Sequence, residues 1–423
     1  MSEIVILKGG LLIDGNGGEP VPDPEIIVEG GRIAGVGSKA GSTTSHSVQV
    51  VDCGDCVLMP GMMDLHVHLS SANDGDYAHI ELANVVRTPA EMLLDAAKNA
   101  RVLLESGFTT LRDMDWVTPH GRNFVQEMGA LRDSIALGKI PGPRLIIGGF
   151  VLTTGSHHDR MQPRVIIRDR ERYGDGPWDI RRVSRRNLRD GADFLKTCVS
   201  GGQCSFDRHD DLWDRNMTQE ELEAVVDEAH AYRKPVAAHC HTPLSVKMAL
   251  EAGVDTVEHC TYVDDDSVSQ LAKSGIYNVP TLALREETVI EERRRRGTEK
   301  FVLEQAKEIA DNCFASFERY REAGVKFAMG TDTCWHPTFG SNARELAIYA
   351  SLGLTEMEAI QTATRNAADA IGMLSDLGTI ETGKIADIIA VDGNPLDDIS
   401  YLQEMARIKV VVKEGEVAVN RLA

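Results

Sequence analysis

The sequence lacks any apolar run of the roughly 18 residues that a membrane span needs. Its first residues lack the basic segment and apolar stretch of a secretory signal, so we expect a cytoplasmic protein. Positive charge is in deficit, because 45 Lys and Arg face 65 Asp and Glu, for a net charge of −20. Such an acidic surface repels nucleic-acid phosphates and anionic lipids, so we expect neither nucleic acid nor membrane as a partner.

The sequence also lacks a cysteine-rich zinc motif. Cys53 and Cys56 have CxxC spacing, but no second CxxC follows to complete four ligands, so we interpret the pair as a turn. The eight cysteines are scattered over 423 residues, which favours reduced thiols. A hydrophobic content of 42% excludes long disorder.

The two ends of the chain share one sequence pattern. Short β-rich runs separated by glycines occupy residues 1–57, and similar runs return over residues 384–423. Strands from both ends can pair with each other. We therefore predict a small β-sandwich domain formed by both termini, 1–57 and 384–423, around a catalytic domain at 58–383.

The middle of the chain alternates short apolar strands with amphipathic helices, which is typical of βα units. Eight such units predict an α/β fold, a (β/α)8 TIM-like barrel, whose active site lies at the carboxyl ends of the strands. The predicted strands are Val57–Met59 leading to Asp64–His68, Thr109–Arg112, Arg144–Ile147, Phe194–Val199, Pro235–His239, Asp255–His259, Ile276–Pro280 and Lys326–Gly330.

Helix start signals lie between these strands. Capping boxes begin at Thr88, Thr218 and Thr355. The connection after the third strand, residues 155–190, is far longer than an ordinary loop, so we expect a lid or substrate loop there.

Metal-binding side chains gather at the predicted strand ends. Alternation along the first strand puts His66 and His68 on one face. The whole set converges on one rim, and imidazoles suit divalent metals, so a metal site is predicted. Its members are His66, His68, Lys196, His239, His259 and Asp332.

Two segments carry a family resemblance. Residues 60–68 read PGMMDLHVH, and residues 378–387 read GTIETGKIAD. With the ordered histidines, lysine and aspartate, they resemble the amidohydrolase superfamily over essentially the whole chain. The similar branch has two metals and a carboxylated lysine, and its nearest subgroup is prolidase-like and carboxypeptidase-like, related to imidazolonepropionase.

The resemblance implies a binuclear centre of two divalent metal ions. Zinc is the first expectation, with manganese, cobalt and iron open. Asp332 would take a proton from a bridging water and pass it to the leaving group. By the resemblance, one metal takes His66, His68 and Asp332, the other takes His239 and His259, and N-carboxylated Lys196 bridges them.

The same resemblance implies substrate contacts. Residues 153–157, TTGSH, are similar to a T-G-G-H segment whose histidine contacts the substrate carbonyl. His157 is favoured for this role over its neighbour His158. His241 replaces a tyrosine that faces substrate in relatives, and a metal-ligand or structural role for it stays open. Arg285 is a candidate partner for a substrate carboxylate.

The implied activity is hydrolysis of an amide bond in N-acyl amino acids, dipeptides or related aryl and alkyl amides. The partners would be a small-molecule substrate and further copies of the chain in a homo-oligomer. Alternatives are hydrolysis of a cyclic amide, urea, carbamate or phosphoester, a silent dihydropyrimidinase-like structural protein, and a zinc-storage module. The complete ligand set argues against the structural protein, and a zinc-storage module would not need Asp332 beside an open coordination position.

Overall fold

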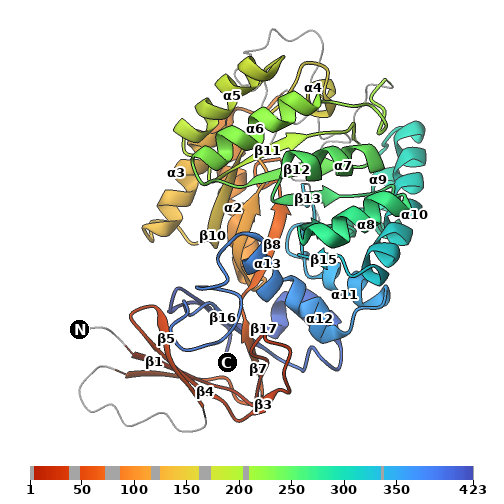
Figure 1. Ribbon diagram of the computed structural model, residues 1–423. Coiled ribbons are helices and arrows are strands. Elements are labelled where there is room, and N and C mark those ends of the chain that lie inside the picture. The colour runs from red at the N-terminus through yellow and green to blue at the C-terminus, as the bar shows by residue number, and fades with distance from the viewer. Residues whose placement is uncertain are drawn as a thin grey trace.

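The computed structural model describes residues 4–37, 48–71, 86–115, 124–161, 173–202, 209–334 and 338–422. A barrel of strands and helices stands above a smaller group of β-sheets in Figure 1. Over these ranges, no helix combines the length and apolar character that crossing a membrane requires.

Both ends of the chain build the smaller part. One sheet has the order β5 (Arg32–Gly37), β4 (Glu25–Glu29), β1 (Ile4–Lys8) and β6 (Val48–Asp52). The other has the order β18 (Glu416–Asn420), β17 (Ile408–Lys413), β16 (Ile388–Val391), β7 (Val57–Pro60), β2 (Leu11–Leu12) and β3 (Val21–Pro22). Antiparallel pairing of β16 with β7 joins the two ends, as predicted.

A single apolar cluster connects the two sheets. Ile26 of the first sheet and Leu58 and Val412 of the second are buried in it. Burial of this apolar area from both sides is what stabilises two sheets packed face to face. The exact limits of this domain, 1–57 and 384–423, stay a prediction.

Eight parallel strands form the barrel. Each pairs with its neighbours in chain order, from first to last. The Leu65 amide donates to the Met329 carbonyl at 2.9 Å, and the His68 amide donates to the Thr333 carbonyl at 3.0 Å, which closes the ring. The predicted TIM-like fold is confirmed. The strands are β8 (Met62–Val67), β9 (Phe108–Asp113), β10 (Arg144–Val151), β11 (Phe194–Cys198), β12 (Val236–Cys240), β13 (Thr256–His259), β14 (Tyr277–Val279) and β15 (Lys326–Phe327).

The beginning of the barrel differs from the prediction. Val57–Met59 lies in β7 of the terminal sheet, and the first barrel strand begins at Met62. The switch occurs at Gly61, where an added Cβ would lie 2.3 Å from the Thr109 hydroxyl. Both strands are buried along their whole length, so periodicity could not reveal that the chain changes sheets there.

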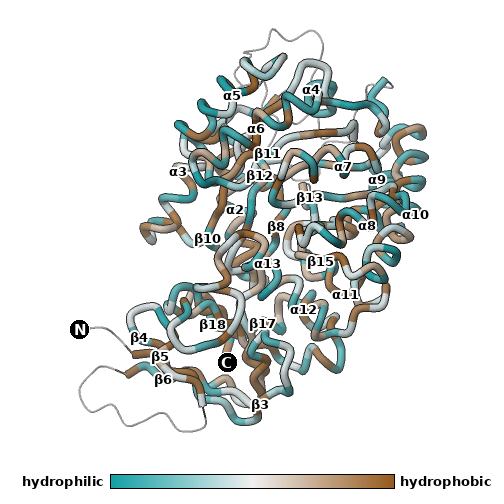
Figure 2. Tube along the Cα trace, in the orientation of Figure 1, coloured by the Kyte–Doolittle hydropathy of each residue, from teal (hydrophilic) through white to brown (hydrophobic). Residues whose placement is uncertain are grey.

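Helices surround the barrel strands (Figure 1). Hydrophobic and hydrophilic residues alternate along the outer helices in Figure 2, as expected when one face of each helix covers the barrel. The capping boxes at Thr88, Thr218 and Thr355 are confirmed. The helices are α2 (Pro89–Glu105), α3 (Val125–Ala136), α4 (His157–Arg160), α5 (Pro177–Arg189), α6 (Gln219–Ala231), α7 (Pro243–Ala252), α8 (Asp265–Ser274), α9 (Glu287–Arg295), α10 (Lys300–Glu322), α11 (Arg344–Ser351), α12 (Glu356–Thr362) and α13 (Arg365–Ala370), with short turns η1 (Ala283–Arg285), η2 (Ile399–Gln403) and η3 (Met405–Arg407).

The expected loop over residues 155–190 is wrong for its second half. Helix α5 occupies Pro177–Arg189 and packs on β10 and α6 as an ordinary barrel helix. Its many arginines hid the helical pattern, because they face outward and leave few apolar positions. A substrate loop is therefore confined to residues before 177, of which 162–172 lie outside the described residues.

Candidate metal centre and active site

One metal-capable cluster joins the end of β8 to the segment after β15. His66, His68 and Asp332 offer ligand atoms within 4.8 Å of one another. Asp332 Oδ1 lies 3.2 Å from His68 Nε2 and 3.6 Å from His66 Nε2. Asp332 has φ of 58°, a strained left-handed conformation, and its amide donates to the His66 carbonyl at 2.7 Å. We call these three residues the first cluster.

A charged network supports the first cluster from inside the barrel. Glu258 accepts from His66 Nδ1 at 2.8 Å and from Arg112 Nη2 at 2.9 Å. Burial alone would raise the pKa of Glu258, but Arg112 and His66 outweigh it and lower the pKa to about 2. His68 Nδ1 contacts the Asp115 carbonyl. Both imidazoles therefore keep Nε2 for a metal.

Asp64 ties the base of this cluster together. Its carboxylate accepts from the His66 amide at 3.0 Å, Thr331 Oγ1 at 2.7 Å and Asn342 Nδ2 at 2.7 Å. Complete burial raises the pKa of Asp64 to about 6 against the effect of these bonds. The bonds fix β8 to the segment that leads into Asp332.

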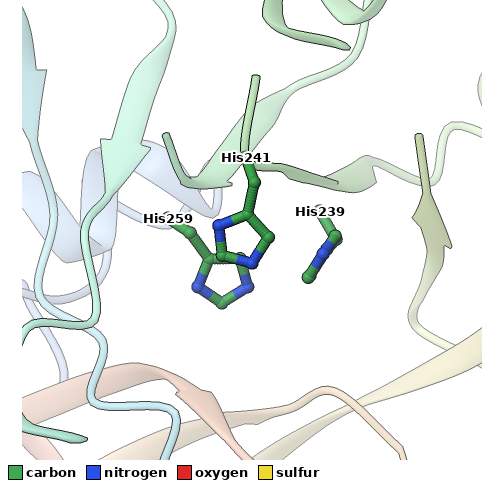
Figure 3. Close-up of side chains that lie close together, drawn as sticks. All are labelled: His239, His241 and His259. Atoms are coloured by element: carbon green, nitrogen blue, oxygen red, sulfur yellow. The ribbon is translucent and has the colours of Figure 1, made fainter. Parts of the chain in front are cut away.

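A second metal-capable cluster follows β12 and β13. His239, His241 and His259 offer ligand atoms within 4.8 Å of one another, and Figure 3 shows the three rings facing a common space. Burial is the main cause that lowers the pKa of all three, so each stays neutral and can donate a lone pair. We call these residues the second cluster.

Each ring of the second cluster has one nitrogen occupied. His259 Nδ1 bonds Thr281 Oγ1 at 2.7 Å, and His241 Nδ1 bonds Thr261 Oγ1 at 2.6 Å. In His239 the occupied nitrogen is Nε2, which lies 3.1 Å from the Gly201 carbonyl, so Nδ1 is the nitrogen available to a metal. His241 Nε2 is buried and makes no hydrogen bond within the described part of the chain. That nitrogen is open to a metal or a substrate.

Lys196 of β11 lies inside the barrel, 1% exposed. It interacts electrostatically with Asp332 of the first cluster and lowers the pKa of His239 in the second. Burial lowers the pKa of Lys196 itself, and its Nζ makes no hydrogen bond to any described residue. A lowered pKa favours the uncharged amine, whose lone pair the reaction with carbon dioxide requires, so the residues fit a carboxylated lysine.

Helix α4 brings both candidate histidines inside. His157 Nδ1 lies 2.6 Å from Asp210 Oδ2, and its ring stacks on His239 at 5.6 Å and 18°. His158 packs on Phe150 at 4.6 Å and contacts a buried thiol. His157 is thus the residue in direct contact with the second cluster.

Arg285 lies next to Asp332 of the first cluster. It is 5% exposed, and its Nη2 is 3.6 Å from Asp332 Oδ2. Burial opposes ionisation of Asp332, but His68, His66 and Arg285 hold its pKa well below the usual range. Asp332 is therefore an anion beside a guanidinium.

Several supporting residues were not foreseen, among them Glu258, Asp210 and Thr281. Strand alternation would turn Glu258 away if His259 faces the site. His259 instead adopts φ of 70°, so both neighbours reach the interior. Thr281 has φ of 57° at the same rim. The position of Glu258, directly before the candidate ligand His259, could have indicated its supporting role. No sequence pattern around Asp210 indicated its contact with His157.

Comparison with known proteins identifies the family. Residues 57–418 match the amidohydrolase family. Ochratoxinase of Aspergillus niger is 29% identical over 443 aligned residues, covering 98% of this chain and 87% of that protein. A crystal structure of a Xaa-Pro dipeptidase with bound methionine has a TM-score of 0.87 and 31% identity, covering 98% of this chain and 99% of the other.

A further crystal structure, a prolidase complexed with N-methylphosphonate-L-proline, has a TM-score of 0.87 and 27% identity. It covers 99% of this chain and 100% of the other. The matched range, residues 57–418, spans the positions of both clusters and Lys196. The chain belongs to the amidohydrolase family and is a metal-dependent hydrolase.

Proposed function

We propose that this protein hydrolyses the amide (C–N) bond of small N-acyl amino acids, dipeptides or related amides. The observation that carries the proposal is the buried Lys196 amine, which makes no hydrogen bond to the described residues and interacts with both clusters. The similar solved structures also support the proposal, because they include a Xaa-Pro dipeptidase and a prolidase with a proline-containing ligand.

Two divalent metal ions would complete the site, with zinc as the first candidate. One would take the first cluster, His66, His68 and Asp332, and the other would take His239 and His259. Carboxylated Lys196 would supply an oxygen ligand to each. When bound, such ions polarise a carbonyl and make water a better nucleophile at neutral pH.

The residues around the metals divide the remaining work. Asp332, held as an anion, accepts a proton from the attacking water and returns it to the amine leaving group. His157 donates toward the substrate carbonyl as negative charge develops there. His241 contacts substrate beside the second cluster, and Arg285 binds a substrate carboxylate.

Metal content and carbon-13 labelling test the bridge. Protein expressed with zinc and ¹³C-bicarbonate should hold two metals per chain by elemental analysis and give one carbamate signal by NMR. Lys196→Ala should lose the signal and retain one metal or none, whereas Lys234→Ala, a substitution on the outer surface, should retain both. One metal per chain that is unaffected by Lys196→Ala would contradict the bridge.

A substrate panel tests the reaction. N-acyl amino acids and dipeptides, including Xaa-Pro, should be cleaved faster than cyclic amides, ureas, carbamates or phosphoesters. A metal-loaded protein that prefers the second group would overturn the proposed substrate class. We also propose a cytoplasmic homo-oligomer, and light scattering after size exclusion measures its mass.

A further inference from the structure

We propose that Asp210 is a positioning residue, which sets the orientation of His157 for its contact with substrate. The inference rests on the proposed function, because it assumes that His157 works at the scissile carbonyl. Asp210 Oδ2 lies 2.6 Å from His157 Nδ1, and the two side chains are 2% and 5% exposed. They come from different connections, after β11 and after β10.

Burial of this carboxylate needs compensation. Removing an ionised carboxylate from water is costly unless it is paired and hydrogen-bonded. Asp210 Oδ1 makes no hydrogen bond within the ranges that the structure describes. The contact with His157 is therefore the interaction that accounts for Asp210 in this place.

The backbone around Asp210 is fastened to helix α4. Arg160, which ends α4, donates from Nη1 to the His209 carbonyl at 2.8 Å and lies 3.7 Å from Asp214. The Gly201 amide in turn donates to the Asp214 carbonyl at 2.9 Å. The segment that carries Asp210 is thus held on both sides of it, so the distance to His157 is fixed by the fold.

The ring of His157 is confined on its other sides. One face stacks on His239. At Gly202 an added Cβ would lie 2.4 Å from the ring, so the backbone approaches closely there. These contacts fix the plane of the ring, but a flip within that plane would exchange Nδ1 for a carbon.

Asp210 removes that freedom. A carboxylate facing Nδ1 accepts the proton of that nitrogen and leaves Nε2 directed at substrate, where the protonated ring can donate to the carbonyl oxygen. The same logic operates where a buried aspartate orients a catalytic histidine. Asp210 therefore acts through His157 and does not touch the reacting atoms.

Steady-state kinetics on four variants test the inference: Asp210→Ala, Asp210→Asn, His157→Gln and the double variant His157→Gln/Asp210→Ala. Asp210→Ala should lower kcat by about 10- to 100-fold, with two metals retained and KM little changed. In the His157→Gln background, Asp210→Ala should cause no further loss, because its effect passes through His157. Asp211→Asn, on the exposed neighbour, is the matched control and should leave kcat unchanged.

The outcomes separate this inference from the proposed function. Equal losses of kcat from Asp210→Ala in both backgrounds, or loss of metal, would overturn the positioning role. Wild-type kcat in Asp210→Ala together with a reduced kcat in His157→Gln would also overturn the positioning role of Asp210. The proposed role of His157 would then stand. A normal His157→Gln would contradict both. If Asp210→Ala does not fold, Asp210→Asn keeps the shape and carries the same comparison.

Discussion

The two metal-capable clusters are supported by different chemistry. The first cluster contains a carboxylate, and its His66 is held by ionised Glu258, itself paired with Arg112. The second cluster contains imidazoles alone, and hydroxyl or carbonyl oxygens hold their rings. One cluster is built with charge and the other without it.

This difference predicts unequal metal binding. A divalent cation gains more from anionic ligands than from neutral imidazoles, because its electrostatic attraction to a ligand grows with the ligand's negative charge. The second cluster must obtain negative charge from elsewhere, and a carboxylated Lys196 is the group that would supply it. We therefore expect the first cluster to hold its metal more tightly and the second to depend on bicarbonate.

The largest effect is expected from removing the carboxylate of the first cluster. Asp332→Asn should lower kcat by about 10²- to 10⁴-fold, the contribution of a general acid–base residue. The second cluster should still bind its metal, because its histidines and Lys196 are unchanged. Stopped-flow or steady-state kinetics with elemental analysis measure both quantities. An active Asp332→Asn enzyme would show that the proton is carried by another residue.

Glu258→Gln tests whether charge behind His66 matters. It should weaken metal binding at the first cluster by about 10- to 100-fold, because His66 loses the anion that orients it. It also leaves Arg112 buried without its ion pair, which should lower the free energy of unfolding by about 3–5 kcal/mol. Competition with a chelator and denaturant titration measure these effects.

Glu228→Gln is the matched control for that variant. Glu228 also pairs with arginines, Arg181 and Arg185, but on the outer helices α5 and α6. Its loss should leave metal affinity unchanged. Equal metal affinity in Glu258→Gln and Glu228→Gln would show that the charge of Glu258 does not strengthen metal binding at the first cluster.

Much of this comparison could be predicted from sequence. Strand ends followed by His, Lys or Asp identified the barrel rim and the six candidate ligands, because parallel strands end at the same edge. Capping boxes such as that at Thr218 located helix starts, since capping is a local interaction. Capping and strand periodicity depend on residues close together in the chain, so both can be recognised in the sequence.

The remaining features depend on contacts between distant segments. Glu258 supports His66 across 192 residues, and Asp210 meets His157 across 53. The left-handed turn at His259 breaks the alternation that the prediction assumed. His241 was expected to face substrate with a metal-ligand role left open, and the fold places its ring within metal-binding reach of His239.

His241→Phe decides between these two roles. If His241 contacts substrate, KM should rise by about tenfold, the loss of roughly one hydrogen bond, with metal content unchanged. If it is a ligand, metal should be lost from the second cluster instead. Elemental analysis beside KM separates the two, and retention of both wild-type values would exclude either role.

The smallest effect on catalysis is expected from a segment next to both clusters. Glu345 accepts from the amides of Leu282 and Ala283, between Thr281, the partner of His259, and Arg285, beside Asp332. Burial raises the pKa of Glu345 to about 8, although these hydrogen bonds oppose the shift. The folded protein thus keeps a proton that the unfolded chain releases above its ordinary pKa near 4.5.

Stability should therefore fall as pH rises from about 4.5 to about 8, because the native state binds more protons than the unfolded state in that window. Glu345→Gln removes this titration and should flatten the pH dependence of the free energy of unfolding, measured by denaturant titration. Glu416→Gln, an exposed change on β18, should keep the wild-type slope. The same slope in Glu345→Gln and wild type would mean that Glu345 is ionised in the folded protein at neutral pH, and that charge, not a neutral carboxyl, holds the segment between the clusters.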